Sequence, residues 1–182
     1  MKISFELSRA DLEHFREVMA RARQAASGLS TEEIVSSARQ LLEHVNHSDT
    51  SDFIREQINK LKPLIDMIVD QGWGLEEEDL KRVVGALTYF SEAEDLIPDD
   101  VPGLGFLDDA IMIEVVATEL KHEIQAYNDF VEFRAKESPR ISEEAGDRER
   151  ADWLEERRQQ LHSRMRRRRR GGRGRKSPFS LL

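Results

Sequence analysis

The chain has 182 residues, which fits one compact domain with an appendage. Apolar residues make up 38% and charged residues 35%, so a core of moderate size must be accompanied by long solvated stretches. The absence of cysteine excludes disulfides, thiolate nucleophiles, iron–sulfur clusters and cysteine-ligated zinc sites.

The formal net charge of −8 conceals a division of charge along the chain. Residues 157–182 hold eleven Lys and Arg and no Asp or Glu, which leaves 17 basic and 36 acidic residues in 1–156. The body therefore carries a formal charge of −19 and the C-terminal segment is cationic. Because like charges repel, only the C-terminal segment can approach nucleic acid or anionic lipid.

Neither a signal segment nor a membrane span is evident. The N-terminus lacks an apolar run typical of secretion. The longest uncharged run within a helical stretch, residues 83–91, has nine residues, whereas a bilayer span needs about 20. We therefore expect a cytoplasmic protein.

Helical periodicity begins close to the N-terminus. The first predicted helix starts at Ser8 with a capping-box pattern and ends at Gly28. The second starts at Ser30, which forms the same pattern with Glu33, and ends near Asn46. Apolar residues recur every three or four positions in both segments, which indicates one buried face on each helix.

A third helical pattern covers 54–68 and contains Pro63, so we expect a kink or a restart near Lys62. The stretch 72–74, Gly-Trp-Gly, interrupts the chain. A fourth helix is expected after 76–78, because three consecutive glutamates suit the positive end of a helix dipole.

The fifth helix is predicted to run without interruption from about 108 to 136 and to end at 137–139, Glu-Ser-Pro. Its expected seam alternates steps of four and three. The seam consists of Phe106, Ala110, Ile113, Ala117, Leu120, Ile124, Tyr127 and Val131. This register places Glu119 and His122 on the outer face.

A sixth helical segment, about 143–169, has few apolar anchors, so we expect a solvated helix that frays into the arginine run. Glycine and arginine from 171 to 176 predict disorder. We therefore predict an all-α helical bundle of about five main helices, with a charged C-terminal helix and a disordered basic tail. The expected divisions are an N-terminal helical hairpin (1–48), a helical domain (49–140) and the charged helix with its tail (141–182).

Five aspartates crowd around a loop before the fifth helix. They are Asp95, Asp99, Asp100, Asp108 and Asp109. The loop is stiffened and turned by Pro98, Pro102, Gly103 and Gly105. In one interpretation the aspartates are structural, with Asp108 capping the fifth helix and Asp109 favoured by its dipole.

The other interpretation is a site for a hard divalent cation such as Mg²⁺, Mn²⁺ or Ca²⁺, which prefers oxygen ligands. Its candidate ligands are Asp95, Asp99, Asp108, Asp109 and Glu114. Glu114 is the only charged residue in 110–118, so we expect it to have a partner or a raised pKa.

This acidic stretch resembles the YkvA family of small bacterial proteins, a domain of unknown function. The matching motif, within roughly residues 80–120, consists of Asp95, Pro98, Asp99, Pro102, Gly105, Asp108 and Asp109. The resemblance implies an α-helical domain and no established reaction.

The basic segment is the second functional signal, because guanidinium groups bind phosphates in a bidentate manner. The candidate anion-binding residues are Arg164, Arg166, Arg167, Arg168, Arg169, Arg170, Arg173, Arg175 and Lys176. Nucleic acid, an acidic protein surface (including the protein's own body) and an anionic membrane are all open as partners.

We therefore predict a non-enzymatic interaction or regulatory module, without catalytic residues or an established cofactor. Its helix faces would bind a protein partner, and its basic segment would add electrostatic attachment to nucleic acid or an acidic surface. One alternative is a metal-dependent hydrolytic enzyme that uses the acidic loop, with Glu114 as base. Another is a peripheral membrane protein.

Overall fold

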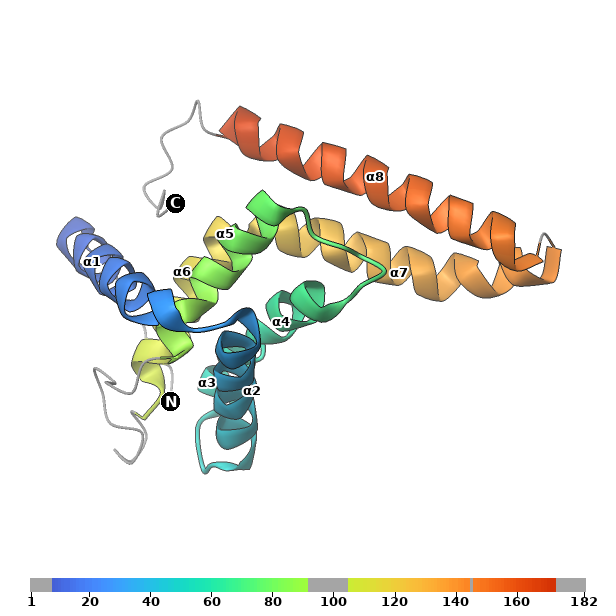
Figure 1. The fold of residues 1–182 in the computed structure, drawn as a ribbon. Coiled ribbons are helices and arrows are strands. Elements are labelled where there is room, and N and C mark those ends of the chain that lie inside the picture. The colour runs from blue at the N-terminus through green and yellow to red at the C-terminus, as the bar shows by residue number, and fades with distance from the viewer. Residues whose placement is uncertain (1–7, 92–104, 145, 173–182) are drawn as a thin grey trace.

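The computed structural model describes residues 8–91, 105–144 and 146–172, and every regular element within these ranges is helical (Figure 1). The α-helices are α1 (Arg9–Ala25), α2 (Thr31–His47), α3 (Asp52–Ile58), α4 (Leu61–Val69), α5 (Glu77–Leu87), α6 (Leu107–Glu119), α7 (Lys121–Glu144) and α8 (Gly146–Gly172). Two short 3-10 helices, η1 (Ala26–Gly28) and η2 (Thr88–Ser91), follow α1 and α5. The predicted all-α bundle is confirmed.

The start of α2 follows from local chemistry. The Ser30 hydroxyl accepts a hydrogen bond from the Glu33 amide at 3.2 Å, and the Ser30 amide donates to the Glu33 carboxylate at 2.7 Å. This reciprocal pair is the predicted capping box. The hydrogen bond from the Ser30 backbone also lowers the pKa of Glu33.

The predicted restart near Lys62 is confirmed. Helix α3 ends at Ile58 and α4 begins at Leu61, which places Pro63 in the first turn of α4. A proline is tolerated there because the first amides of a helix have no partner within the helix. The apolar faces of α2 and α4 then pack on each other and share one core with α5 and η2.

The predicted uninterrupted helix from 108 to 136 is wrong. Leu120 has φ −92° and ψ 16° and separates α6 from α7, although hydrogen bonds on either side of it persist. The predicted end at 137–139 is also wrong, because α7 continues through Pro139 to Glu144. A proline removes one hydrogen bond from a helix, and α7 as a whole is supported by its packing along α8.

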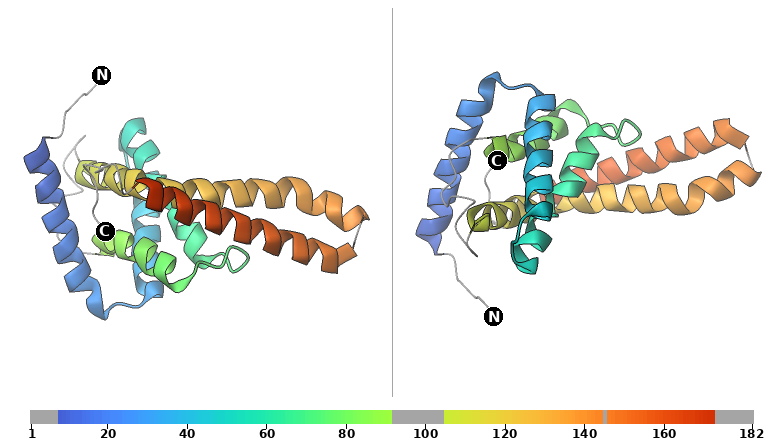
Figure 2. Two further views of the ribbon diagram at one scale, coloured as in Figure 1. Left: turned by 90° about the horizontal axis from the view of Figure 1, so that it is seen from above. Right: turned by 90° about the horizontal axis from the view of Figure 1, so that it is seen from below.

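Helices α7 and α8 form a long antiparallel hairpin whose closed end extends away from the other helices (Figures 1 and 2). Helix α8 remains helical through the arginine run and ends at Gly172. The expected fraying into this run, and disorder from Gly171, are therefore wrong for 166–172. The rest of the segment expected to be disordered lies outside the described residues.

Trp73 joins the hairpin to the rest of the core. The short turn between α4 and α5 carries Trp73 inward, where its side chain is fully buried. The Trp73 ring lies 5.2 Å from the ring of Phe130 on α7 and 4.1 Å from that of His162 on α8. Aromatic stacking therefore anchors both arms of the hairpin to the α4–α5 turn.

Asp70 holds this turn in place. Its carboxylate accepts hydrogen bonds from the Gly72 amide at 2.9 Å, from the Arg134 guanidinium at 3.0 and 2.7 Å, and from the Tyr127 hydroxyl at 3.2 Å. Burial alone would raise the pKa of Asp70, but the hydrogen bonds and charge of Arg134, together with hydrogen bonds from the Trp73 amide and the Tyr127 hydroxyl, outweigh burial and lower it. Burial, together with the nearby Asp70 carboxylate, raises the pKa of Tyr127 to about 12.

Within the described ranges, none of the helices is long and apolar enough to cross a membrane.

Candidate anion-binding surface on α8

Much of the predicted acidic loop lies outside the described residues. This holds for Asp95, Pro98, Asp99, Asp100, Pro102 and Gly103. The cation site that combines these aspartates with those of α6 therefore stays a prediction.

Asp108 and Asp109 are both buried in the first turn of α6, directly after the buried Gly105 and Phe106. The residue that precedes the helix is Phe106, at φ 64° in the left-handed region, so the expectation that Asp108 is the cap is wrong. Carboxylates in a first helical turn are stabilised by the helix dipole, as expected for Asp109.

Glu114 lies apart from these aspartates, on the exposed side of α6, and forms an ion pair with Lys60. The expected partner of Glu114 is thus a lysine between α3 and α4. The pair borders a groove of about 580 Å³ between α4, α6 and α7. Among the described residues, no group of three or more His, Asp or Glu side chains could hold a metal ion.

The five consecutive arginines at 166–170 of α8 fall into two sets that face different surroundings. We call Arg166 and Arg169 the inner arginines, because their guanidinium groups point to carboxylates of the body. Arg166 lies 2.7 Å from Glu76, and Arg169 lies 2.5 Å from Asp79. We call the exposed residues Arg167, Arg168 and Arg170 the outer arginines.

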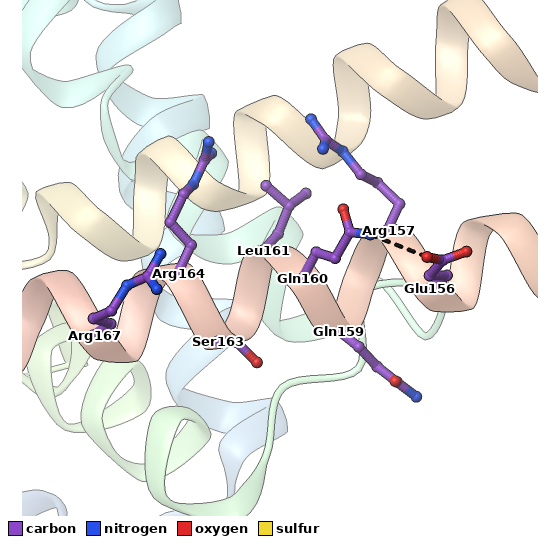
Figure 3. A pocket seen from close by; sticks show the side chains of 8 residues that line it. All are labelled: Glu156, Arg157, Gln159, Gln160, Leu161, Ser163, Arg164 and Arg167. Carbon is purple, nitrogen blue, oxygen red and sulfur yellow. Dashed lines mark hydrogen bonds between the residues drawn. The ribbon is translucent and has the colours of Figure 1, made fainter.

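Arginines on the side of α8 that faces α7 make a further group of contacts. Figure 3 shows Arg157 and Arg164 pointing toward α7 at a surface pocket of about 530 Å³, with Ser163 pointing away. Arg164 forms an ion pair with Asp129. One turn later, Arg168 donates a hydrogen bond to Gln125 at 2.9 Å while the residue stays exposed.

The inner arginines bind a buried carboxylate pair, which consists of Asp79 on α5 and Glu123 on α7. Each carboxylate side chain is only 1% exposed. Arg169 bridges them, at 2.5 Å from Asp79 and 3.1 Å from Glu123, and Arg166 lies 3.5 Å from Asp79. Buried charges are tolerated only when paired, so the carboxylate pair requires α8 to be docked.

Arg82 on α5 completes the charge balance from the other side. Its Nε atom lies 3.3 Å from the Glu123 carboxylate, and its guanidinium lies 3.7 Å from Glu119. The prediction that Glu119 is on the outer face is wrong, because its side chain is only 8% exposed.

The error comes from the predicted seam. Among the α7 residues whose burial is described, the buried positions are Glu123, Ala126, Tyr127 and Phe130, whereas the predicted Val131 is exposed and Ile124 is only half-buried. A seam predicted from apolar residues alone leaves out a buried glutamate and assigns the apolar residue beside it to the buried face. The sequence pattern therefore did not reveal Glu123, the neighbouring carboxylate Asp79 or the Arg82 counter-charge. The available signal was a pair of glutamates four residues apart, Glu119 and Glu123, which helical spacing places on the same face. Such a pair of like charges needs an arginine or lysine from another helix.

His162 lies beneath this charged surface and is 4% exposed. Its Nε2 atom donates to the Trp73 carbonyl at 3.1 Å, an assignment that follows because a carbonyl can only accept. Burial lowers the pKa of His162, since a charged imidazolium would lose its hydration where the ring is stacked on Trp73. The ring is therefore neutral near pH 7.

Residues 80–114 match the model of a family described as a protein of unknown function (DUF1232). The matched segment spans most of α5, all of η2 and the first half of α6, and is consistent with the resemblance to the YkvA family. Comparison with curated proteins finds no match, and neither does comparison with solved structures.

Proposed function

We propose that this protein is a non-enzymatic interaction module that uses α8 and the basic residues after it to bind nucleic acid. The outer arginines carry this proposal: Arg167, Arg168 and Arg170 are exposed at the C-terminal end of α8. In the sequence they are followed by Arg173, Arg175 and Lys176, and no acidic residue follows Glu156. Such a run can contact successive phosphates and release their counterions.

The surroundings of α8 favour a phosphate backbone over a membrane surface. The exposed side of α8 around its arginine run presents Gln160, Ser163 and Arg167, and the exposed Trp153 lies apart from them, nearer the start of the helix. Helices that bind in the membrane interface insert an apolar face. Guanidinium groups without such a face match the regular anionic charge of nucleic acid.

The division of the arginines explains how an acidic body can carry a cationic site. The inner arginines neutralise Asp79 and Glu123, so α8 is attached to the body by charge. The outer arginines then project from a rigid helix rather than from a free chain. The body would be left to bind a protein partner through its helix faces, as the sequence predicts.

The proposal is tested by fluorescence anisotropy of a labelled DNA duplex and a labelled single strand, titrated with full-length protein at several salt concentrations. We expect affinity to fall steeply with salt. The variant Arg167→Gln/Arg168→Gln/Arg170→Gln should reduce the slope of log affinity against log salt by about 0.9 for each phosphate that it no longer neutralises.

The matched control is Arg21→Gln/Arg39→Gln/Lys62→Gln, which removes the same charge from exposed positions of α1, α2 and α4. This control should bind with nearly the wild-type slope. Equal affinities for the outer-arginine variant and the wild type would overturn the proposal. Binding only to anionic lipid vesicles would favour the peripheral membrane alternative.

A further inference from the structure

We propose that the anion-binding surface of α8 extends to the inner arginines, Arg166 and Arg169, and that Asp79 and Glu123 hold this part of the site closed. The carboxylates occupy the guanidinium groups that a phosphate would otherwise bind. This inference rests on the proposed function, because it concerns competition for the same cationic helix.

The inner arginines belong to the same unbroken run as the outer ones. Arg166 and Arg169 alternate with exposed Arg167, Arg168 and Arg170 along one and a half turns of α8. Their side chains are 27% and 22% exposed, so they lie at the edge of the surface rather than deep in the core. A long arginine side chain at such an edge can turn its head toward solvent while its stem stays packed.

Carboxylates of the body hold the guanidinium groups of Arg166 and Arg169 in their inward position. Asp79 and Glu123 are almost completely buried, and their counter-charges are Arg166, Arg169 and Arg82. If a phosphate takes Arg166 and Arg169, Glu123 keeps Arg82, whereas Asp79 loses both of the arginines with which it pairs. Leaving a buried charge without its partner is strongly unfavourable. Binding by the inner arginines is therefore opposed by the body.

Because carboxylates and phosphates compete for the inner arginines, a substitution that removes a buried carboxylate should increase affinity. Removing negative charge at Asp79 and Glu123, which are buried and touch no ligand, should raise the affinity for an anionic polymer. Two released arginines that neutralise phosphates should steepen the salt slope by about 2 on duplex DNA. With this steeper slope, the affinity of the variant should fall about tenfold more than that of the wild type when salt is raised from about 50 to about 200 mM.

The test compares Asp79→Asn/Glu123→Gln with a control of equal charge, Glu77→Gln/Glu132→Gln. Both control residues are exposed, and their ion-pair partners are Lys81 and Lys136 rather than arginines of α8. Anisotropy titrations of full-length protein with the same DNA duplex measure affinity and salt slope. Because the control changes the net charge equally, the long-range field of the body is the same in both variants.

A second pair of variants covers the case in which the buried double substitution does not fold. Glu76→Gln removes a carboxylate that is 65% exposed and pairs with Arg166. Its neighbour Glu77, which is 79% exposed and pairs with Lys81, supplies the matched control Glu77→Gln. Glu76→Gln removes the nearer of the two carboxylates beside Arg166, while Asp79 stays 3.5 Å away. We expect a gain in affinity over this control that is smaller than for the double variant, with a slope steeper by at most about 1.

The outcomes separate this inference from the proposed function. Tighter binding and a steeper slope for Asp79→Asn/Glu123→Gln, and a smaller gain for Glu76→Gln, would support the closed inner site. If the wild type binds DNA but neither variant exceeds its control, the inner site is overturned and the proposed function stands. If no variant binds DNA at any salt concentration, both are overturned.

Discussion

The packing of α2 on α4 and the packing of α8 on α5 and α7 stabilise the same molecule by different means. Between α2 and α4 the contacts are apolar, and residues such as Ala38 and Leu64 are completely buried. Beneath α8 the contacts include Trp73 and Leu161, but the edge of the interface is built from ion pairs. The apolar interface depends on shape and volume, whereas the charged one also depends on salt, pH and competing anions. A helix such as α8, whose ion pairs attach it to the body, can stay docked while its other guanidinium groups remain exposed.

The largest effect should come from the apolar interface. Leu64→Ala removes a completely buried side chain of α4, and we expect the free energy of unfolding to fall by about 3 kcal/mol. Urea unfolding followed by circular dichroism measures this change. Val69→Ala, at an exposed position of the same helix, should change it by less than about 0.5 kcal/mol. Equal losses for the two variants would contradict the assigned core.

At the charged interface, Arg169→Gln leaves Asp79 and Glu123 with fewer counter-charges. We expect a loss of about 2 kcal/mol, below the usual range for a buried pair because Arg166 and Arg82 remain. Arg167→Gln, two residues away and exposed, should have almost no effect on stability. Since Asp79→Asn removes one buried charge, the double variant Asp79→Asn/Arg169→Gln should recover part of the loss. No recovery would argue against direct coupling.

The Asp70–Arg134 pair gives a smaller effect that depends on pH. Asp70→Asn should destabilise the protein by about 1–2 kcal/mol at neutral pH, because a hydrogen-bonded ion pair at a half-buried turn is lost. The pKa of Asp70 is lower in the folded protein than in the unfolded chain. Its stabilising contribution is therefore complete above pH about 4 and is lost as pH falls through the lower folded value. Denaturant titrations at several pH values should show wild type and variant converging in acid, and a constant difference would contradict this role.

The smallest effect concerns His162. Its pKa is lowered in the folded protein, so the unfolded chain binds a proton more readily below pH about 6.5. The wild type should lose stability as pH falls from about 6.5 toward the lower folded value. His162→Gln removes this part of the pH dependence. Thermal melts at pH 7.5 and 5.5 measure it, and an unchanged pH dependence in the variant would show that His162 is not the group responsible.

Predictions from the sequence succeeded where interactions are local. Ser30 and Glu33 are three residues apart, and Pro63 acts on its own helical turn, so the cap and the restart follow from neighbouring residues alone. The predictions failed at Leu120 and Glu123. There the buried face of α7 includes a charge whose partners, Arg82 and Arg169, are about 40 or more residues away in the sequence. For Glu114, the need for a partner was predictable, but its identity as Lys60 was not.

Local patterns in the sequence were sufficient to establish that the protein is helical, that α2 begins at the Ser30 capping box, and that a cationic segment follows an acidic body. Which arginines of α8 are bound and which are exposed depends on the packing of the helices. Helical periodicity places Arg166 and Arg169 on one face and Arg167 and Arg170 on another. It does not show what covers either face, because the covering carboxylates come from α5 and α7 and are brought there by the packing of the hairpin around Trp73.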